Sequence, residues 1–275
     1  MLLEKYKLNN NEEINKIAFG TWQISNEEVV EAVKAALEIG YRHIDTAIAY
    51  ENEEGIARGI KESNISRDEI FITSKIPAHI KSYEEAKLMI KDSLKRLDTD
   101  YLDLMLIHAP KPWNELFNGS ENNYFKENLE VWKAMEEAVE AGLIKSIGVS
   151  NFEIEDIQNI IDNAKIKPVV NQIRVHIGHT PKGIINSCKE QDIVVMAFSP
   201  NASGKLINNE EVANIANKYQ VSTARLSIRY DYQLGLIPLP RSTNYNHILE
   251  NKEINFEISK EDMAVLANID EISVL

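Results

Sequence analysis

Four side chains of this sequence could together deliver a proton to an oxygen atom: those of Asp45, Tyr50, Lys75 and His108. A tyrosine with an ordinary pKa of about 10 is a poor acid at neutral pH, but a neighbouring ammonium such as that of Lys75 would stabilise its phenolate. Because an ammonium is costly to bury alone, the Asp45 carboxylate would keep it charged, and His108 could hydrogen-bond a substrate oxygen. Each residue alone has an ordinary structural explanation. The combination is typical of a site that reduces a carbonyl group.

Eight short runs rich in Val, Ile and Leu predict the strands that position these residues. The runs lie near residues 17, 41, 70, 102, 145, 168, 193 and 236. Helical patterns lie between them; Ser25 and Glu28, for example, predict the start of a helix that Gly40 ends. Strand–helix alternation with right-handed crossovers gives a parallel sheet, and eight units predict a closed barrel. We therefore predict an α/β fold, a (β/α)8 TIM barrel, whose chemistry lies at the carboxyl ends of the strands.

Further segments are expected outside the eight units. The two longest intervals between strands hold a loop over Ala109 to Asn123 and an additional helix over Glu210 to Tyr219. A terminal helix over Ser259 to Asn268 makes two additional helices. An N-terminal β-hairpin over Lys5 to Ile17 is expected to cover one mouth of the barrel. No linker divides the chain, so residues 1–275 are expected to form a single domain.

Composition excludes several classes of function. The 275 residues include 43 acidic and 30 basic side chains, and the net charge of −13 repels nucleic acid and anionic lipid. No apolar run approaches the roughly 18 to 20 residues that span a bilayer, and the N-terminus lacks the apolar core of a signal peptide. The one cysteine, Cys188, fits a reducing compartment. We expect a cytoplasmic protein with no nucleic-acid or membrane partner. His176 and His179 have helical-turn spacing but no carboxylate partner pattern, so no metal is expected.

Seven ordered blocks of residues cover nearly the whole chain. They are GTW (20–22), GYRHIDTA (40–47), TSK (73–75), LIH (106–108), GVSNF (148–152), NQ (171–172) and FSP (198–200). Together they resemble the aldo/keto reductase family, in particular its short bacterial-type members of the diketogluconate and methylglyoxal reductase kind. The resemblance implies a barrel that binds a nicotinamide dinucleotide without a Rossmann domain, and the sequence has no G-x-G-x-x-G motif. It also implies hydride transfer from the cofactor, with Tyr50 as general acid, Asp45 and Lys75 tuning it, and His108 orienting the carbonyl.

The same resemblance implies the cofactor contacts. Ser150, Asn151 and Gln172 would hydrogen-bond the nicotinamide carboxamide, which needs donors and acceptors. Taken alone, Ser150 and Asn151 could instead cap the helix before Glu153. Phe198 would stack on the nicotinamide ring. The full set of implied contacts is Gly20, Thr21, Trp22, Ser150, Asn151, Gln172, Phe198, Ser199, Pro200, Arg241, Ser242, Thr243, His247, Glu250 and Asn251.

Departures from the family pattern bear on cofactor and substrate. Arg241, Ser242 and Thr243 would bind a 2′-phosphate, but His247 stands where the family usually has a second arginine, so NADP(H) is favoured and NAD(H) stays possible. Trp22 and Trp113 would line the substrate pocket. Ala109 replaces a common tryptophan and the sequence ends at Leu275, so we expect an open pocket.

We expect NADPH-dependent reduction of aldehydes and ketones to alcohols by a monomer, the family tendency. Methylglyoxal, diketo-sugar acids, aromatic aldehydes and α-keto esters all stay open as substrates. The alternative is a catalytically weak nicotinamide-binding regulatory or interaction subunit of the same fold. A barrel hydrolase would need two acids at strand ends facing a cleft, and only Asp45 meets that requirement.

Overall fold

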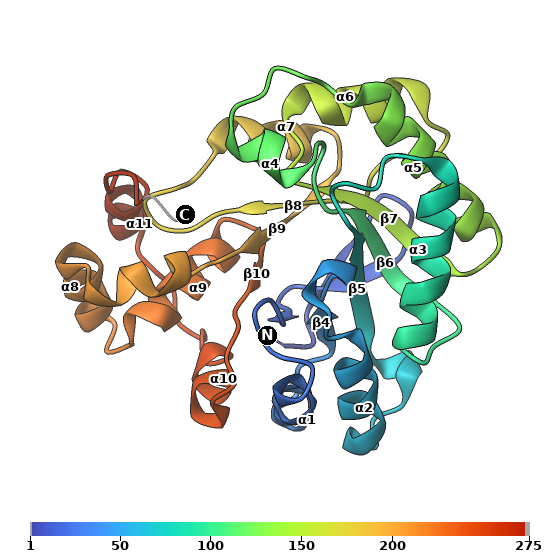
Figure 1. Cartoon of the computed structure of the whole chain (residues 1–275). Helices are drawn as coiled ribbons and strands as arrows, with labels where there is room; N and C mark the ends of the chain where they lie inside the picture. Colours follow the sequence, from blue (N-terminus) through green and yellow to red (C-terminus); the bar gives the residue numbers. More distant parts are fainter. Residues whose placement is uncertain (1, 273–275) are drawn as a thin grey trace.

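The computed structural model describes residues 2–272, and eight parallel strands lie at its centre (Figure 1). Each strand pairs with the next one along the chain. The eight strands are β3 Phe19–Gly20, β4 His43–Asp45, β5 Phe71–Ile76, β6 Leu102–Ile107, β7 Ile144–Ser150, β8 Val170–Arg174, β9 Val194–Phe198 and β10 Ile237–Leu239. All eight predicted strands are confirmed.

The expectation of an open pocket rested in part on the end of the sequence at Leu275. That residue lies outside the described residues.

The sheet closes on itself between its first and last strands. The Ala18 N–H donates to the Pro238 carbonyl at 3.2 Å, and the Gly20 N–H donates to the Pro240 carbonyl at 3.0 Å. A Cβ atom at position 20 would lie 3.3 Å from the Leu239 carbonyl oxygen, so glycine suits this close approach. The predicted (β/α)8 barrel is confirmed.

Helices form the outer layer around the strands (Figure 1). Helix α1 shows why the sequence patterns predicted them: Val29, Val33 and Leu37 are buried on one face, and Gly40 ends the helix with a φ of 112°. The helices between or after the strands are α1 Glu28–Ile39, α2 Glu53–Ser63, α3 Tyr83–Arg96, α5 Phe125–Glu140, α6 Ile154–Asn163, α7 Lys182–Glu190, α9 Thr223–Gln233 and α10 Tyr245–Asn251. Within residues 2–272, no helix has the length and apolar character that crossing a bilayer requires.

Two additional helices were expected, and α8 Glu210–Lys218 and α11 Lys260–Leu266 are those helices. A short further helix, α4 Trp113–Phe117, lies in the segment that was expected to be a loop. It forms because the Pro112 carbonyl accepts hydrogen bonds from the Glu115 and Leu116 N–H groups, at 3.0 and 2.9 Å.

The N-terminal hairpin covers the mouth at the amino ends of the strands. Strand β1 Lys5–Lys7 pairs with β2 Glu13–Asn15 in antiparallel register. Between them, Asn9 donates to the Pro168 carbonyl at 2.9 Å and Asn10 donates to Ser146 Oγ at 3.0 Å, near the starts of β8 and β7. The loops at the opposite mouth therefore carry the predicted site.

Candidate active site

Asp45 and Lys75 form a buried ion pair at the carboxyl ends of β4 and β5. Lys75 Nζ lies 2.7 Å from Asp45 Oδ1 and 2.7 Å from the Thr46 carbonyl oxygen. The other carboxylate oxygen, Asp45 Oδ2, accepts a hydrogen bond from Gln172 Nε2 at 2.7 Å. Burial lowers the pKa of Lys75 and raises the pKa of Asp45, and their mutual attraction opposes both shifts. Both charges thus have hydrogen-bonded partners, which a buried pair requires.

The rings of Tyr50 and His108 lie beside this pair. Tyr50 ends the 3-10 turn Ile48–Tyr50 after β4, and His108 directly follows β6. Lys75 Nζ is 5.1 Å from the centroid of the Tyr50 ring. The Tyr50 and His108 ring centroids are 5.6 Å apart, with an interplanar angle of 69°. The structure therefore brings the four residues predicted as catalytic to one rim of the barrel.

The pKa of Tyr50 shifts in the direction opposite to the expectation. Burial raises it well above the ordinary value, and the negative charge of Asp45 raises it further. Lys75 does not reverse this shift, because its charge is largely offset by that of Asp45, whereas burial removes water that would stabilise a phenolate. The chain by itself therefore keeps Tyr50 protonated at neutral pH.

His108 is a neutral imidazole in this site. Burial and the positive charge of Lys75 lower its pKa to about 3. Its ring also meets that of Trp113 edge to face, with centroids 5.1 Å apart at 85°. A neutral ring can donate one hydrogen bond to a substrate oxygen, but it is not the stronger acid that an imidazolium would be.

We expect the His108 ring to stay uncharged between about pH 5 and pH 8, where an ordinary histidine titrates. Between its ordinary pKa of 6.5 and its lowered pKa of about 3, the unfolded chain binds a proton that the folded protein does not. Through this group the stability therefore falls as the pH falls through that window. Nuclear magnetic resonance titration of the ring protons, assigned with His108→Gln, measures this pKa. A His108 resonance that titrates near its ordinary pKa would contradict the prediction.

Ser150, Asn151 and Gln172 form a polar cluster at the ends of β7 and β8. Ser150 Oγ donates to the Gln172 carbonyl at 2.8 Å, and Asn151 Nδ2 lies 3.0 Å from both Ser150 Oγ and the His108 carbonyl oxygen. Because the Gln172 amide nitrogen donates to Asp45, the amide oxygen is left as an acceptor. The cluster thus offers the mixed donors and acceptors that suit a carboxamide.

The alternative that Ser150 and Asn151 cap the next helix is wrong. Glu153 holds the N-cap position of α6, and its N–H donates to the Asp156 carboxylate at 3.1 Å. Asn151 instead has a φ of 58°, and its N–H donates to the Gln172 carbonyl at 2.9 Å. The backbone of Asn151 is therefore hydrogen-bonded to the end of β8 and does not cap α6.

The other predicted cofactor residues lie at the ends of β3, β9 and β10 and on α10. Gly20 lies close to the residues that follow β10: a Cβ at this position would be 3.8 Å from the Arg241 Cβ. The N–H of the next residue, Thr21, donates to the Asp45 carbonyl at 3.1 Å and so joins the end of β3 to the end of β4. Asn244 caps α10, and Ser242 Oγ accepts from its N–H at 3.0 Å. The exposed members are Trp22, Arg241, Thr243, His247 and Glu250; Phe198, Ser199 and Ser242 are partly exposed; Gly20, Thr21, Pro200 and Asn251 are buried.

Of the two predicted pocket residues, Trp113 has a ring contact with one of the proposed catalytic residues, His108. It also stacks on Phe117, with centroids 5.6 Å apart at 16°. Trp22 is 45% exposed and makes no ring contact in the described part of the chain. Phe117 was not expected in the site; its spacing of four residues from Trp113 would have indicated it if α4 had been predicted.

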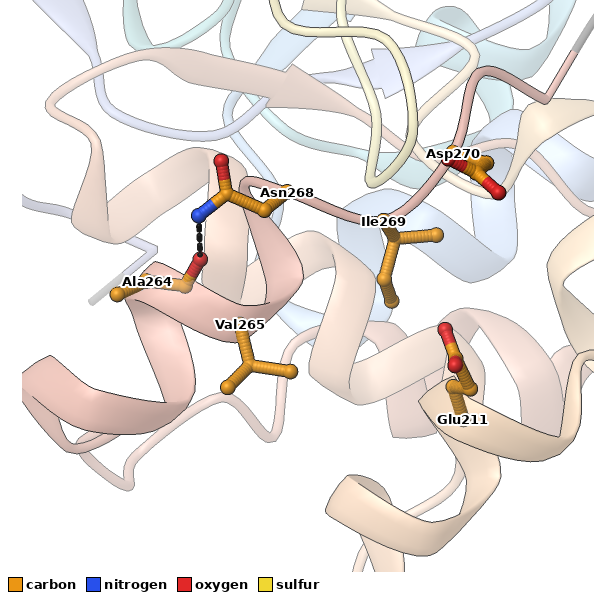
Figure 2. Close-up of a pocket in the computed structure, with 6 residues that line it drawn as sticks. All are labelled: Glu211, Ala264, Val265, Asn268, Ile269 and Asp270. Carbon is orange, nitrogen blue, oxygen red and sulfur yellow. Dashed lines mark hydrogen bonds between the residues drawn. The ribbon is translucent and has the colours of Figure 1, made fainter.

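Two other features lie outside this site. His176 and His179 lie in a turn and not on a helix, and each donates its backbone N–H to the carbonyl of the other. Within residues 2–272, no three His, Cys, Asp or Glu side chains form a cluster that could hold a metal ion. A shallow hollow between α8 and α11 is lined by none of the predicted site residues (Figure 2). Its lining is Glu211, Ala264, Val265, Asn268, Ile269 and Asp270.

A model of the Aldo/keto reductase family matches residues 16–271. The chain belongs to the aldo/keto reductase family. This membership identifies it as an NAD(P)H-dependent oxidoreductase. The aldo/keto reductase is 40% identical over 264 residues to a glyoxal reductase of Bacillus subtilis, covering 95% of this chain and 91% of the relative. It is 35% identical over 268 residues to a methylglyoxal reductase of Escherichia coli, covering 96% and 93%.

Solved structures give the same result for the fold. An aldo-keto reductase of Bombyx mori in complex with NADP has a TM-score of 0.88 and 33% identity, over 99% of this chain and 94% of that one. An aldo-keto reductase from a deep-sea metagenome has a TM-score of 0.89 and 36% identity, over 97% and 95%.

Proposed function

We propose that this aldo/keto reductase uses NADPH to reduce small aldehydes and ketones to alcohols, with Tyr50 as the general acid. The observation that carries the proposal is the buried Asp45–Lys75 ion pair beside the rings of Tyr50 and His108. A cation held next to a phenol stabilises the phenolate that forms when the proton leaves.

Each residue has a separate part in the proposed reaction. His108 donates a hydrogen bond to the carbonyl oxygen and orients it. The bound nicotinamide supplies a hydride. Tyr50 keeps its proton until negative charge develops on the carbonyl oxygen and then transfers it there. Lys75 stabilises the resulting phenolate, and Asp45 keeps Lys75 charged.

NADPH is the cofactor that the residues at the end of β10 would prefer. Arg241 is exposed beside the hydroxyl groups of Ser242 and Thr243, and a guanidinium with hydroxyl donors suits a phosphate dianion. His247 is exposed on α10, and an imidazole lacks the fork of donors with which a guanidinium binds a phosphate, so we propose that NADH is also used, less efficiently.

The proposed substrates are small 2-oxoaldehydes. The names of two relatives, glyoxal reductase and methylglyoxal reductase, support this class. We also propose that the active protein is a monomer, in line with the family tendency.

Steady-state assays with methylglyoxal, and with NADPH or NADH in turn, test the proposal. We expect one NADPH to be consumed for each alcohol formed, with a higher kcat/KM for NADPH than for NADH. Fluorescence titration with NADPH is the control for binding. Tight NADPH binding without turnover on methylglyoxal or on a panel of other carbonyls would favour the alternative of a nicotinamide-binding subunit.

A further inference from the structure

Lys81 connects the loop after β5 to the segment between β6 and α5. Its Nζ donates to the Ala109 carbonyl oxygen at 3.1 Å and to Asn128 Oδ1 at 2.8 Å. Asn128 is buried on α5, and its own Nδ2 donates to the Pro110 carbonyl oxygen at 2.9 Å. The backbone that directly follows His108 is therefore held by two side chains.

The same ammonium also meets the far end of this segment. Lys81 Nζ lies 5.7 Å from the centroid of the Tyr124 ring. The Tyr124 hydroxyl in turn donates to the Glu115 carboxylate. One lysine thus contacts both the first and the last residue of the segment 109–124.

The interior of segment 109–124 is held by its own hydrogen bonds. Lys111 Nζ donates to the Ser120 carbonyl at 2.7 Å, and Glu115 accepts from Ser120 and Asn122, each at 3.1 Å. A segment braced in this way can move as one unit, so its position depends on what holds its two ends.

The position of the segment matters because it carries Trp113 against the His108 ring. We propose that Lys81 is a positioning residue for the reductase: by holding both ends of segment 109–124, it holds Trp113 where the substrate carbonyl meets His108. This role rests on the proposed function. It needs no direct contact between Lys81 and the substrate.

The environment of Lys81 makes the contact sensitive to protons. Burial lowers the pKa of Lys81 to about 7, opposed by the attraction of Asp156 on α6 and Glu127 on α5. The other groups that face its Nζ are the Tyr124 ring, the Asn128 amide and the Ala109 carbonyl. If the segment opens, the amine is hydrated and regains an ordinary, higher pKa. Proton uptake therefore favours opening, and the segment is held more firmly as the pH rises above about 7.

Three variants separate positioning from general structure: Lys81→Met, Lys81→Arg and, as a matched control, Lys87→Met. Like Lys81, Lys87 lies over a tyrosine ring, that of Tyr83. Lys87 also donates to the Tyr83 hydroxyl at 2.9 Å, but it lies on α3, outside segment 109–124. We expect Lys81→Met to raise amide hydrogen exchange in residues 109–124 and the KM for methylglyoxal by about ten- to a hundredfold, the effect of losing charged hydrogen bonds. NADPH affinity and kcat should stay within about twofold, because the ion pair and the carboxamide cluster are untouched.

The conservative variant and pH complete the test. Lys81→Arg keeps two donors and should restore most of the protection below the pKa of Lys81. The fall in KM that we expect in the wild type as the pH rises above this pKa should be absent in both Lys81 variants. Should Lys81→Met be too unstable to study, Tyr124→Leu removes the contact at the other end and should raise exchange in the same residues.

Wild-type exchange in residues 109–124 of Lys81→Met, or equal increases in Lys87→Met, would overturn the positioning role. So would increased exchange with an unchanged KM. A wild-type protein that reduces no carbonyl would refute the proposed function, while the exchange data would still show whether Lys81 holds the segment.

Discussion

Tyr50→Phe is expected to lower kcat by about 10²- to 10⁴-fold, the usual contribution of a general acid. The substitution removes only a hydroxyl group that makes no hydrogen bond within residues 2–272, so the ring should keep its edge-to-face contact with His108. Burial and Asp45 hold the pKa of Tyr50 high, so the wild-type hydroxyl is protonated when the carbonyl binds. The phenylalanine variant has no proton to give there.

Single-turnover absorbance measurements of NADPH oxidation give this rate, and fluorescence titration gives the NADPH affinity. We expect the affinity to change by less than about threefold, because the predicted carboxamide cluster does not include Tyr50. Tyr83→Phe removes the same atom from a helix start outside the site and should react at the wild-type rate. A loss of only a few fold in Tyr50→Phe would exclude Tyr50 as the acid.

Lys75→Met is expected to reduce both activity and stability. Loss of the cation removes the charge that would stabilise the phenolate, and removing one such electrostatic group costs about 10²- to 10³-fold in kcat. It also leaves Asp45 buried without its ion-pair partner, 2.7 Å away in the wild type. Breaking a buried pair in this way costs about 3 to 5 kcal/mol in the free energy of unfolding.

The double variant Asp45→Asn with Lys75→Met separates the two effects. It contains no unpaired buried charge, so it should recover most of the lost stability, as measured by urea unfolding, while kcat stays low. Asp68→Asn with Lys34→Met, two changes at the surface and away from the site, is the control and should leave activity unchanged. If turnover returned together with stability in the first double variant, Lys75 would have only a structural role.

The strands and most helices of this barrel could be predicted because their signals are local. Apolar runs with turn residues predicted all eight strands, and Ser25, whose Oγ accepts from the Glu28 N–H at 3.2 Å, predicted the start of α1. Helix α4 was missed, since five residues are too few to show a helical period. Phe117 was missed with it.

The sequence by itself determined which side chains end which strands, because strand order and the parallel arrangement follow from alternation along the chain. Asp45, Lys75 and His108 were therefore expected at one rim. Only the tertiary structure decided what each side chain does to the others. The hydrogen bond from Gln172 to Asp45 spans 127 positions, and Lys81 reaches Ala109 and Tyr124 across separate elements. The raised pKa of Tyr50 could not be predicted from the sequence for the same reason. It depends on burial and on the distance in space to Asp45, and neither follows from separation along the chain.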